Sequence, residues 1–241
     1  DGSFILGTVS KGYIRLDGQG HILERIDQKK GLGNNTILSI YEDFDKNLWL
    51  GLDNGISVVN LNSAFKIFAD FKGILGSVYT SFDDNDNFYL GTNQGLYIKR
   101  KSKSEDFQLV KGTAGQVWDI KEIDGTIFCG HNKGTFLIKE NKAIQVFDRS
   151  GTWEVKKVPG RNDLLLQGNY NGLSTLVKSN GKWIYGDKIE GFDISSKSFD
   201  FAAPNKLVVN HEFKGLHILD LNDRLNLVEN LSIVPKIGYD S

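Results

Sequence analysis

The sequence of 241 residues is poor in the residues that mark several common classes of protein. A single cysteine, Cys129, excludes an intrachain disulfide and a zinc site built from several cysteines. No apolar run approaches the roughly 18 residues of a membrane-spanning helix, and no signal-peptide pattern opens the chain. The formal net charge of -1 gives no overall field that would attract nucleic acid or an acidic membrane surface. Methionine is absent, also from position 1, so we expect an excised piece or a processed product.

What the chain does have is an internal repeat. Each copy has an apolar run, a short polar turn that ends in glycine, and a second run rich in β-branched and aromatic residues, as in "LWLGLDNGISVV" at 48–59. This pattern predicts a tight antiparallel hairpin in which the glycine adopts a positive φ. The glycines recur every 38 to 43 residues, at Gly12, Gly55, Gly95, Gly134, Gly172 and Gly215.

Two further strand-like segments flank each hairpin. "NTILSIYED" precedes the hairpin of Gly55 and "FKIFA", at 65–69, follows it, and similar segments surround the other glycines. Four short strands in about forty residues, with 3 prolines in the chain and no helical periodicity, are typical of a propeller blade. The sequence therefore predicts an all-β chain that forms a single β-propeller of six blades, each with four antiparallel strands. Part of a seven-bladed propeller is the alternative.

The two ends of the chain look complementary. The first repeat lacks its first strand, and the final segment "NLSIVPKIGYDS" resembles the first strand of the second repeat. We therefore expect strand Ser232–Tyr239 to complete the N-terminal blade and close the ring, which would leave no open sheet edge. The expected single domain, 1–241, then has these blade units: 1–30 plus 231–241, 31–70, 71–110, 111–148, 149–190 and 191–230.

The second repeat resembles a known family. "GLGNNTILSIYEDFDKNLWLGLDNGISVVNL", at 31–61, is similar to the two-component regulator propeller repeat. Positions that fit the pattern are Asn34, Asn35, Ile40, Asp43, Leu48, Trp49, Gly51 and Gly55, while Lys46 and Leu52 replace the usual glycine and threonine. The 88–95 segment is a fair match, and the other repeats keep little beyond strand, glycine and strand.

The resemblance implies a place outside the cytoplasmic membrane in bacteria of the Bacteroidetes type. Proteins of this family carry such propellers before a three-tyrosine β-sandwich and a histidine kinase or LuxR-like DNA-binding domain, and many are implied to sense glycans. This sequence has no phosphoacceptor-histidine box, no nucleotide-binding glycine loop and no helix-turn-helix, so kinase or regulator chemistry cannot be assigned to it. No motif for a cofactor or metal ion is present.

Several conspicuous residues have a structural interpretation. Trp49 is expected in the core between blades, where Tyr89, Phe128 and Val208 take the equivalent place, and Cys129 is expected to be a small buried residue. The acidic segments that begin at Asp43 and Asp83 imitate a calcium loop but lack its glycine and glutamate, so we expect turns. "KRKSKS" at 99–104 is expected to be a solvated hairpin, and His131 and His211 lie in different blades, too far apart for a zinc site.

Function is expected where the glycine hairpins and the loops that enter each blade emerge, on one face around the central channel. Amides, carboxylates and aromatic rings suit a carbohydrate, although the same residue types are common in turns. The candidate ligand-binding residues are Asn34, Asn35, Asp53, Asn54, Asn93, Gln94, Trp118, His131, Asn132, Trp153, Asn169, Tyr170, His211 and Glu212.

Three functions are compatible with this pattern. The first is a non-catalytic extracytoplasmic sensor that binds an oligosaccharide or another domain of its regulator. The second is a propeller enzyme, of the lyase or lactonase type, with acids such as Glu42, Asp119 and Glu122 near the channel. The third is a spacer or homodimerisation platform.

Overall fold

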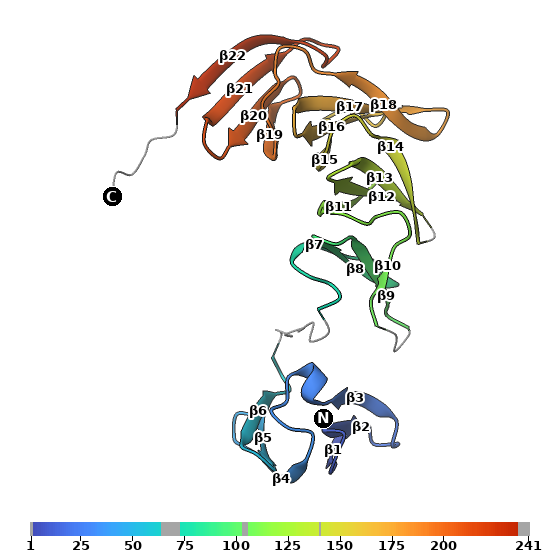
Figure 1. Ribbon diagram of the computed structural model, residues 1–241, viewed down its shortest axis with the longest axis vertical. Coiled ribbons are helices and arrows are strands. Elements are labelled where there is room, and N and C mark those ends of the chain that lie inside the picture. The colour runs from blue at the N-terminus through green and yellow to red at the C-terminus, as the bar shows by residue number, and fades with distance from the viewer. Residues whose placement is uncertain (1, 64–72, 103–105, 140, 236–241) are drawn as a thin grey trace. The chain divides into compact units, whose positions relative to one another are not determined.

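The computed structural model describes residues 2–63, 73–102, 106–139 and 141–235 and divides into two compact units, Asp1–Ile74 and Leu75–Ser241 (Figure 1). The described part is built of strands, apart from one 3-10 turn at Gln28–Lys30. None of its segments is a helix long and apolar enough to cross a membrane.

The first unit contains two three-stranded antiparallel sheets that share one core. Buried side chains from both sheets, among them Tyr13 and Leu50, meet in this core. The outer strand predicted at 65–69 lies outside the described residues. The strands are β1 (Phe4–Gly7), β2 (Tyr13–Leu16) and β3 (Ile22–Ile26) in one sheet, and β4 (Ile37–Glu42), β5 (Asn47–Leu52) and β6 (Ile56–Asn60) in the other.

The second unit contains four four-stranded antiparallel sheets, and in each sheet the strands lie side by side in chain order. The third sheet, counted along the chain, has β7 (Val78–Asp83), β8 (Asn87–Thr92), β9 (Leu96–Arg100) and β10 (Gln108–Leu109). The fourth has β11 (Val117–Ile123), β12 (Thr126–His131), β13 (Gly134–Lys139) and β14 (Lys142–Phe147). The fifth has β15 (Thr152–Lys157), β16 (Leu164–Asn169), β17 (Gly172–Ser179) and β18 (Lys182–Lys188). The sixth has β19 (Ser198–Ala203), β20 (Lys206–His211), β21 (Gly215–Leu221) and β22 (Val228–Val234).

These sheets confirm the predicted all-β class and the repeated antiparallel unit, and they are consistent with propeller blades. The predicted glycine hairpins are present in all six sheets. Each of the six repeat glycines has a positive φ, between 69° at Gly12 and 157° at Gly95. Close packing adds a second reason for glycine, because a Cβ atom at Gly134 would lie 1.8 Å from the carbonyl oxygen of Phe147.

The predicted closure by the C-terminal strand is wrong for the residues that the structure describes. Ile233 lies in β22, which pairs with β21 in the sixth sheet, whereas Ile5 lies in the separate sheet β1–β3. The cause is a turn before β22, in which Leu225 has a φ of 56° and donates its N–H to the carbonyl of Asn222. This turn brings the chain back beside β21, and the apolar alternation of the segment suits a fourth strand as well as a first. The rest of the predicted strand, 236–239, lies outside the described residues.

Trp49, predicted to lie in the core between blades, is not buried by the first unit itself. Its side chain is 44% exposed, whereas the equivalent Tyr89 and Phe128 are buried between neighbouring sheets of the second unit. The first unit, as described, has no third sheet to cover that face of β4–β6. Instead, the indole Nε1 of Trp49 donates a hydrogen bond of 2.8 Å to Asp43 Oδ2. Cys129 is fully buried as predicted, and this burial raises the pKa of its thiol.

Candidate functional site

The hairpin turns and the entry loops lie at the same end of each sheet, as predicted. In the third, fourth and fifth sheets the first residue of the first strand pairs with the last residue of the second strand. The pairs are Val78 with Thr92, Val117 with His131, and Thr152 with Asn169.

Two of the predicted binding residues hold these loops in place. Asn93 Oδ1 accepts a hydrogen bond of 2.9 Å from the backbone N–H of Ser77, and the N–H of Asn93 donates to the carbonyl of Ser77 at 3.0 Å. Asn132 makes the same pair of bonds with Gln116, at 3.1 and 2.9 Å. In these two sheets the asparagine side chain therefore ties the hairpin to the entry loop.

Predicted binding residues of the first unit also form hydrogen bonds within its loops. Asn34 Oδ1 accepts from the N–H of Thr36 at 2.8 Å, and Asn35 Oδ1 accepts from the N–H of Gln28 at 2.7 Å. Asp53 donates its backbone N–H to the carbonyl of Thr36. The side chains of Asp53 and Asn54 are exposed at the turn.

Aromatic residues are displayed at β-bulges in the first strands of three successive sheets. The pairing register shifts around Tyr79 in β7, Trp118 in β11 and Trp153 in β15. A bulge turns the extra residue away from the regular alternation of the strand. The ring centroids of Tyr79 and Trp118 lie 4.9 Å apart, and those of Trp118 and Trp153 lie 4.8 Å apart.

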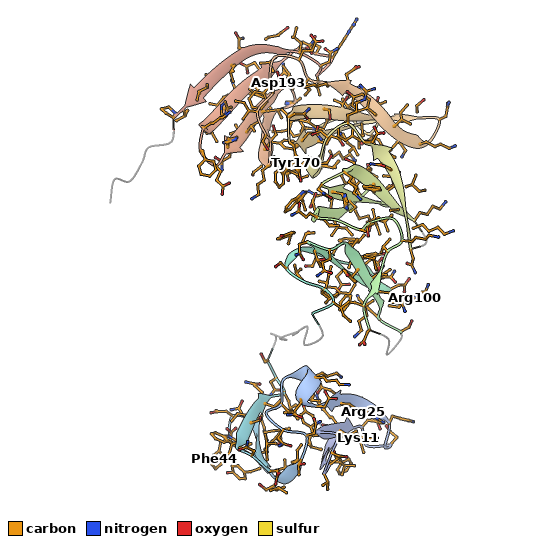
Figure 2. The ribbon with its side chains drawn as sticks, viewed as in Figure 1. Lys11, Arg25, Phe44, Arg100, Tyr170 and Asp193 are labelled. Atoms are coloured by element: carbon orange, nitrogen blue, oxygen red, sulfur yellow. The ribbon has the colours of Figure 1, made fainter. Side chains whose placement is uncertain are left out.

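Tyr170, labelled in Figure 2, extends this series from the turn between β16 and β17. Its ring lies 4.7 Å from that of Trp153, and its hydroxyl accepts a hydrogen bond of 2.7 Å from Trp118 Nε1. We call Tyr79, Trp118, Trp153 and Tyr170 the aromatic row. The row remains open to solvent, since Tyr79 is 46% and Tyr170 36% exposed. Burial raises the pKa of Tyr170, so its hydroxyl is protonated at neutral pH.

Charged side chains on the same first strands form a ladder beside the row. Lys121 Nζ lies 2.9 Å from Asp119 Oδ2 and 3.8 Å from Glu154 Oε2. Lys156 Nζ continues the ladder, 3.8 Å from Glu154 Oε1 and 3.3 Å from Asp200 Oδ2. Burial raises the pKa of the Asp119 and Glu154 carboxyls, against the opposing effect of the lysines. This charge ladder places hydrogen-bond donors and acceptors on β11, β15 and β19, with Asp119 and Glu154 each 19% exposed. Glu154 Oε1 also accepts the N–H of Phe199 at 3.1 Å.

A closed circuit of five buried polar side chains lies behind the row. Gln167 Nε2 can only donate, and it donates to Ser174 Oγ at 2.9 Å, while Gln167 Oε1 accepts from Thr135 Oγ1 at 2.7 Å. The directions of the other bonds follow: Ser174 donates to Asn169 Oδ1 at 2.5 Å, Asn169 Nδ2 donates to Thr152 at 3.0 Å, and Thr152 donates to Thr135 at 2.9 Å. Each group in this polar circuit therefore donates once and accepts once. Its members Thr152 and Asn169 immediately precede Trp153 and Tyr170.

The structure separates the predicted residues into two groups. Trp118, Trp153 and Tyr170 come together in the aromatic row, whereas Asn169 is buried in the polar circuit and His131 is buried in its own turn. His131 Nδ1 accepts from the N–H of Lys133, its Nε2 lies 3.2 Å from the carbonyl oxygen of Thr113, and burial lowers its pKa. His211, Glu212, Gln94, Asp53 and Asn54 stay at the turns of their own sheets.

Sequence reasoning missed Tyr79 and the whole charge ladder except Asp119. The available signal was the alignment of "SVYTSF" with "QVWDIK" and "GTWEVK", which places Tyr79, Trp118 and Trp153 at one repeat position. It also missed Lys197, whose Nζ lies 5.6 Å from the centre of the Trp153 ring, and Ser195, which accepts from Trp153 Nε1 at 2.9 Å.

The acidic segments form turns, as predicted. Asp43 accepts hydrogen bonds from Trp49 Nε1, from the N–H of Asn47 at 2.8 Å and from Asn47 Nδ2 at 3.1 Å. These bonds, the one from Trp49 above all, lower the pKa of the Asp43 carboxyl. Asp84 accepts in the same way from the N–H of Asp86 and from Asn87. Within the described ranges, no three His, Cys, Asp or Glu side chains lie close enough to share a metal ion.

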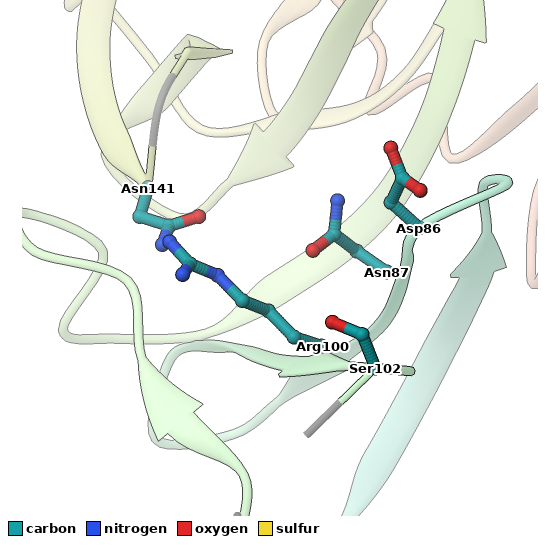
Figure 3. A pocket seen from close by; sticks show the side chains of 5 residues that line it. All are labelled: Asp86, Asn87, Arg100, Ser102 and Asn141. Carbon is teal, nitrogen blue, oxygen red and sulfur yellow. The ribbon is translucent and has the colours of Figure 1, made fainter.

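A hollow of about 310 Å³ lies at the other end of the third sheet, where Asn87 pairs with Arg100 (Figure 3). It has no aromatic wall, and positive and negative groups line it together. The lining residues are Asp86, Asn87, Arg100, Ser102 and Asn141. Because the aromatic row lies at the opposite end of this sheet, the hollow is not part of the row.

Repeated antiparallel sheets with glycine hairpins define the class of protein as a propeller-like repeat protein. The chain carries a repeat of the family described as two component regulator propeller, which matches residues 31–54. This match confirms the resemblance found in the second repeat. A curated relative, histidine kinase P4 of Formosa agariphila, is 32% identical over 84 residues, covering 32% of this chain and 6% of the kinase.

Solved structures show the same fold at lower identity. The extracellular domain of a hybrid two-component system of B. thetaiotaomicron superposes with a TM-score of 0.65 and 16% identity, covering 95% of this chain and 33% of that domain. A second such domain from B. thetaiotaomicron has a TM-score of 0.51 and 18% identity, covering 97% of this chain and 36% of the other. The chain therefore spans about a third of these extracellular domains and a small fraction of the kinase.

Proposed function

We propose that this chain is part of the extracytoplasmic, ligand-sensing region of a bacterial two-component regulator and that it binds an oligosaccharide along the aromatic row without chemical conversion. The regulator repeat at 31–54 and the likeness to extracellular domains of hybrid two-component systems support the sensing role. The site within the chain is proposed from its own side chains.

The observation that carries the proposal is that the fifth sheet differs from its neighbours at one position of the hairpin turn. At one position of the turn the third and fourth sheets have the loop-tying residues Asn93 and Asn132, and the fifth sheet has Tyr170. Tyr170 keeps only the backbone bond, from its N–H to the carbonyl of Gly151 at 3.0 Å, and turns its ring toward Trp118 and Trp153. The fold does not require an aromatic residue there, so we assign it to binding.

The chemistry of the row and the ladder suits a sugar chain. Apolar edges and faces of aromatic rings pack against the C–H groups of a pyranose, while hydroxyl groups need nearby donors and acceptors. The ammonium groups of Lys121 and Lys156, 31% and 26% exposed, supply donors on the strands that carry the two tryptophans. The carboxylates of Asp119 and Glu154, each 19% exposed, supply acceptors. This combination favours an oligosaccharide over an apolar ligand.

The arrangement also indicates how binding would be transmitted. The row joins the third, fourth and fifth sheets, and its rings already contact one another without ligand. A ligand shifts an equilibrium only between states that it contacts differently. Since the sheets themselves are closely packed, we propose that the ligand changes how this propeller packs against other domains of its regulator.

The test is direct binding of purified protein to cello-, xylo- and alginate oligosaccharides, followed by calorimetry and tryptophan fluorescence. Trp118→Ala and Trp153→Ala should each weaken binding of the best oligosaccharide at least about tenfold, which corresponds to about 1.4 kcal/mol. Phe44→Ala is the matched control, because Phe44 is a fully exposed aromatic residue outside the row (Figure 2).

Two results would contradict the proposal. One is the absence of binding to every oligosaccharide in a wider glycan array. The other is binding that survives both tryptophan variants unchanged, which would place the ligand elsewhere on the chain. Release of a shortened or oxidised sugar during incubation would contradict the non-catalytic part alone.

A further inference from the structure

We infer that Gly151 is a positioning residue of the aromatic row: it leaves room for the ring of Tyr170 and thereby sets the geometry of the proposed binding site. The expected effect on ligand binding rests on the proposed function. The close contact between Gly151 and the ring of Tyr170 is observed in the fifth sheet and does not depend on that proposal. Gly151 is buried and directly precedes β15.

The ring of Tyr170 lies directly over the backbone of Gly151. A Cβ atom at residue 151 would lie 2.5 Å from Cζ, 2.6 Å from Cε2 and 2.8 Å from Cε1 of the Tyr170 ring. Carbon atoms in contact prefer about 3.5–4.0 Å, so even alanine would displace the ring. The φ of Gly151 is not in the left-handed region, which means that the backbone itself would accept a side chain.

The other sheets show that glycine is not needed for the loop itself. Residues 77 and 116 occupy the same place, because each accepts the backbone N–H of the turn residue opposite it, as Gly151 does from Tyr170. Those residues are Ser77 and Gln116, and both carry side chains. Their turn partners are Asn93 and Asn132, which are smaller than tyrosine. Gly151 and Tyr170 therefore depart from the repeat together.

The surrounding contacts restrict where a displaced ring could go. Tyr170 N–H is held by the carbonyl of Gly151, and the preceding Asn169 is fixed by its bonds to Thr152 and Ser174. With its backbone fixed, Tyr170 can relieve the clash only by rotating its side chain. Rotation would break the hydrogen bond from Trp118 and the ring contact with Trp153.

The test is a double-mutant cycle with Gly151→Ala, Tyr170→Asn and the combined variant. Tyr170→Asn gives the fifth sheet the turn residue of its neighbours. Packed aromatic rings in a fixed environment give a near-UV circular dichroism signal, which needs no ligand. We expect Gly151→Ala to lose the part of this signal that Tyr170→Asn also loses, and to have no further effect in the Tyr170→Asn background. Urea unfolding should remain cooperative in all three variants.

Binding supplies the second readout. For the cello-, xylo- or alginate oligosaccharide that binds the parent protein best, Gly151→Ala should weaken affinity about tenfold, or about 1.4 kcal/mol. Gln116→Ala, at the same position of the fourth sheet, is the matched control and should leave affinity unchanged. An unchanged spectrum in Gly151→Ala, or an equal effect with and without Tyr170, would overturn the inference. If no oligosaccharide binds the parent protein, the proposed function fails, whereas the spectra still decide whether Gly151 positions Tyr170.

Discussion

Two neighbouring interfaces of the second unit each contain an apolar cluster, but they differ at two equivalent positions of their strands. Between the third and fourth sheets the contact is apolar, with Val117, Ile120 and Cys129 among its buried residues. Between the fourth and fifth sheets, Thr152 and Gln167 occupy the places of Val117 and Cys129 and belong to the polar circuit. Two members of the polar circuit, Thr152 and Asn169, directly precede Trp153 and Tyr170 in the chain.

The difference shows what a buried polar network adds to a sheet interface. Apolar packing is tolerant, since side chains of similar volume can fill the same space. A circuit in which every group donates and accepts once has few alternative arrangements, and a missing member leaves its neighbours without partners. We interpret the circuit as the element that fixes one orientation of the strands carrying the aromatic row.

The largest effect is expected in the apolar interface. Ile120→Ala should reduce the free energy of unfolding by about 3 kcal/mol, because it removes buried methyl groups and leaves a cavity between two sheets. Urea unfolding would measure this loss. Ile144→Ala is the control, since Ile144 is 51% exposed and its truncation should change stability by about 0.5 kcal/mol or less. Equal effects of the two variants would contradict the assigned core.

A smaller loss, about 2 kcal/mol, is expected when the polar interface is made to resemble the apolar one. Thr152→Val keeps the shape of the side chain but leaves the Asn169 amide and the Thr135 hydroxyl each short of a partner. The urea midpoint should fall with little change in the slope. Val117→Thr, the reciprocal change, should also destabilise the protein, because it places a hydroxyl in an apolar contact. A neutral Thr152→Val would mean that the circuit does not stabilise this interface.

The pH dependence of stability should change when a ladder carboxyl is neutralised. The pKa of Asp119 is raised by burial, so the folded state binds its proton more tightly than the unfolded state does. This contribution is fully present below the unfolded pKa and is lost as the pH rises through the higher, folded pKa. Asp119→Asn should therefore flatten the fall in stability across that acidic window. Urea unfolding at several pH values would measure the free energy of unfolding of both proteins. Plots of this free energy against pH that run parallel for the parent and the variant would contradict the prediction. Lys121 lies 2.9 Å from this carboxyl, and Glu154 lies 3.8 Å from the same lysine.

The smallest effect is expected for an exposed ion pair that links the same two sheets. Lys157 Nζ lies 2.8 Å from Asp124 Oδ2, and both side chains are about two-fifths exposed, at 40% and 44%. Lys157→Gln should cost about 0.5 kcal/mol or less, because solvent screens such pairs. A loss as large as that of Thr152→Val would remove the contrast between the buried circuit and surface charge.

The sequence predicts what every repeat shares and little of what distinguishes one repeat from the next. Glycine hairpins, strand positions and the common end of turns and loops follow from patterns that occur in all six copies. Trp118, Trp153 and Tyr170 were accessible as candidates because aromatic residues near turns are conspicuous. Asn93 and Asn132 looked like equally good candidates, since a single sequence does not show that their amides are taken up by backbone groups.

Most of the features that could not be predicted from the sequence depend on contacts between sheets. The polar circuit joins residues up to 32 positions apart, from Thr135 to Gln167, and neither strand pattern nor spacing predicts such a bond. The misassigned closing strand has a related cause. An alternating apolar segment fits the first or the fourth place in a sheet, and only the turn before Val228 decides between them.

The bulges in the first strands have an evolutionary consequence. The same register shift occurs in the second sheet, where it presents Leu38 with 68% exposure instead of an aromatic ring. Under the proposed function, single substitutions at these displayed positions would retune recognition while the hydrophobic interior stays untouched. Gene duplication followed by drift at a handful of codons would then be enough to diversify a set of paralogous receptors.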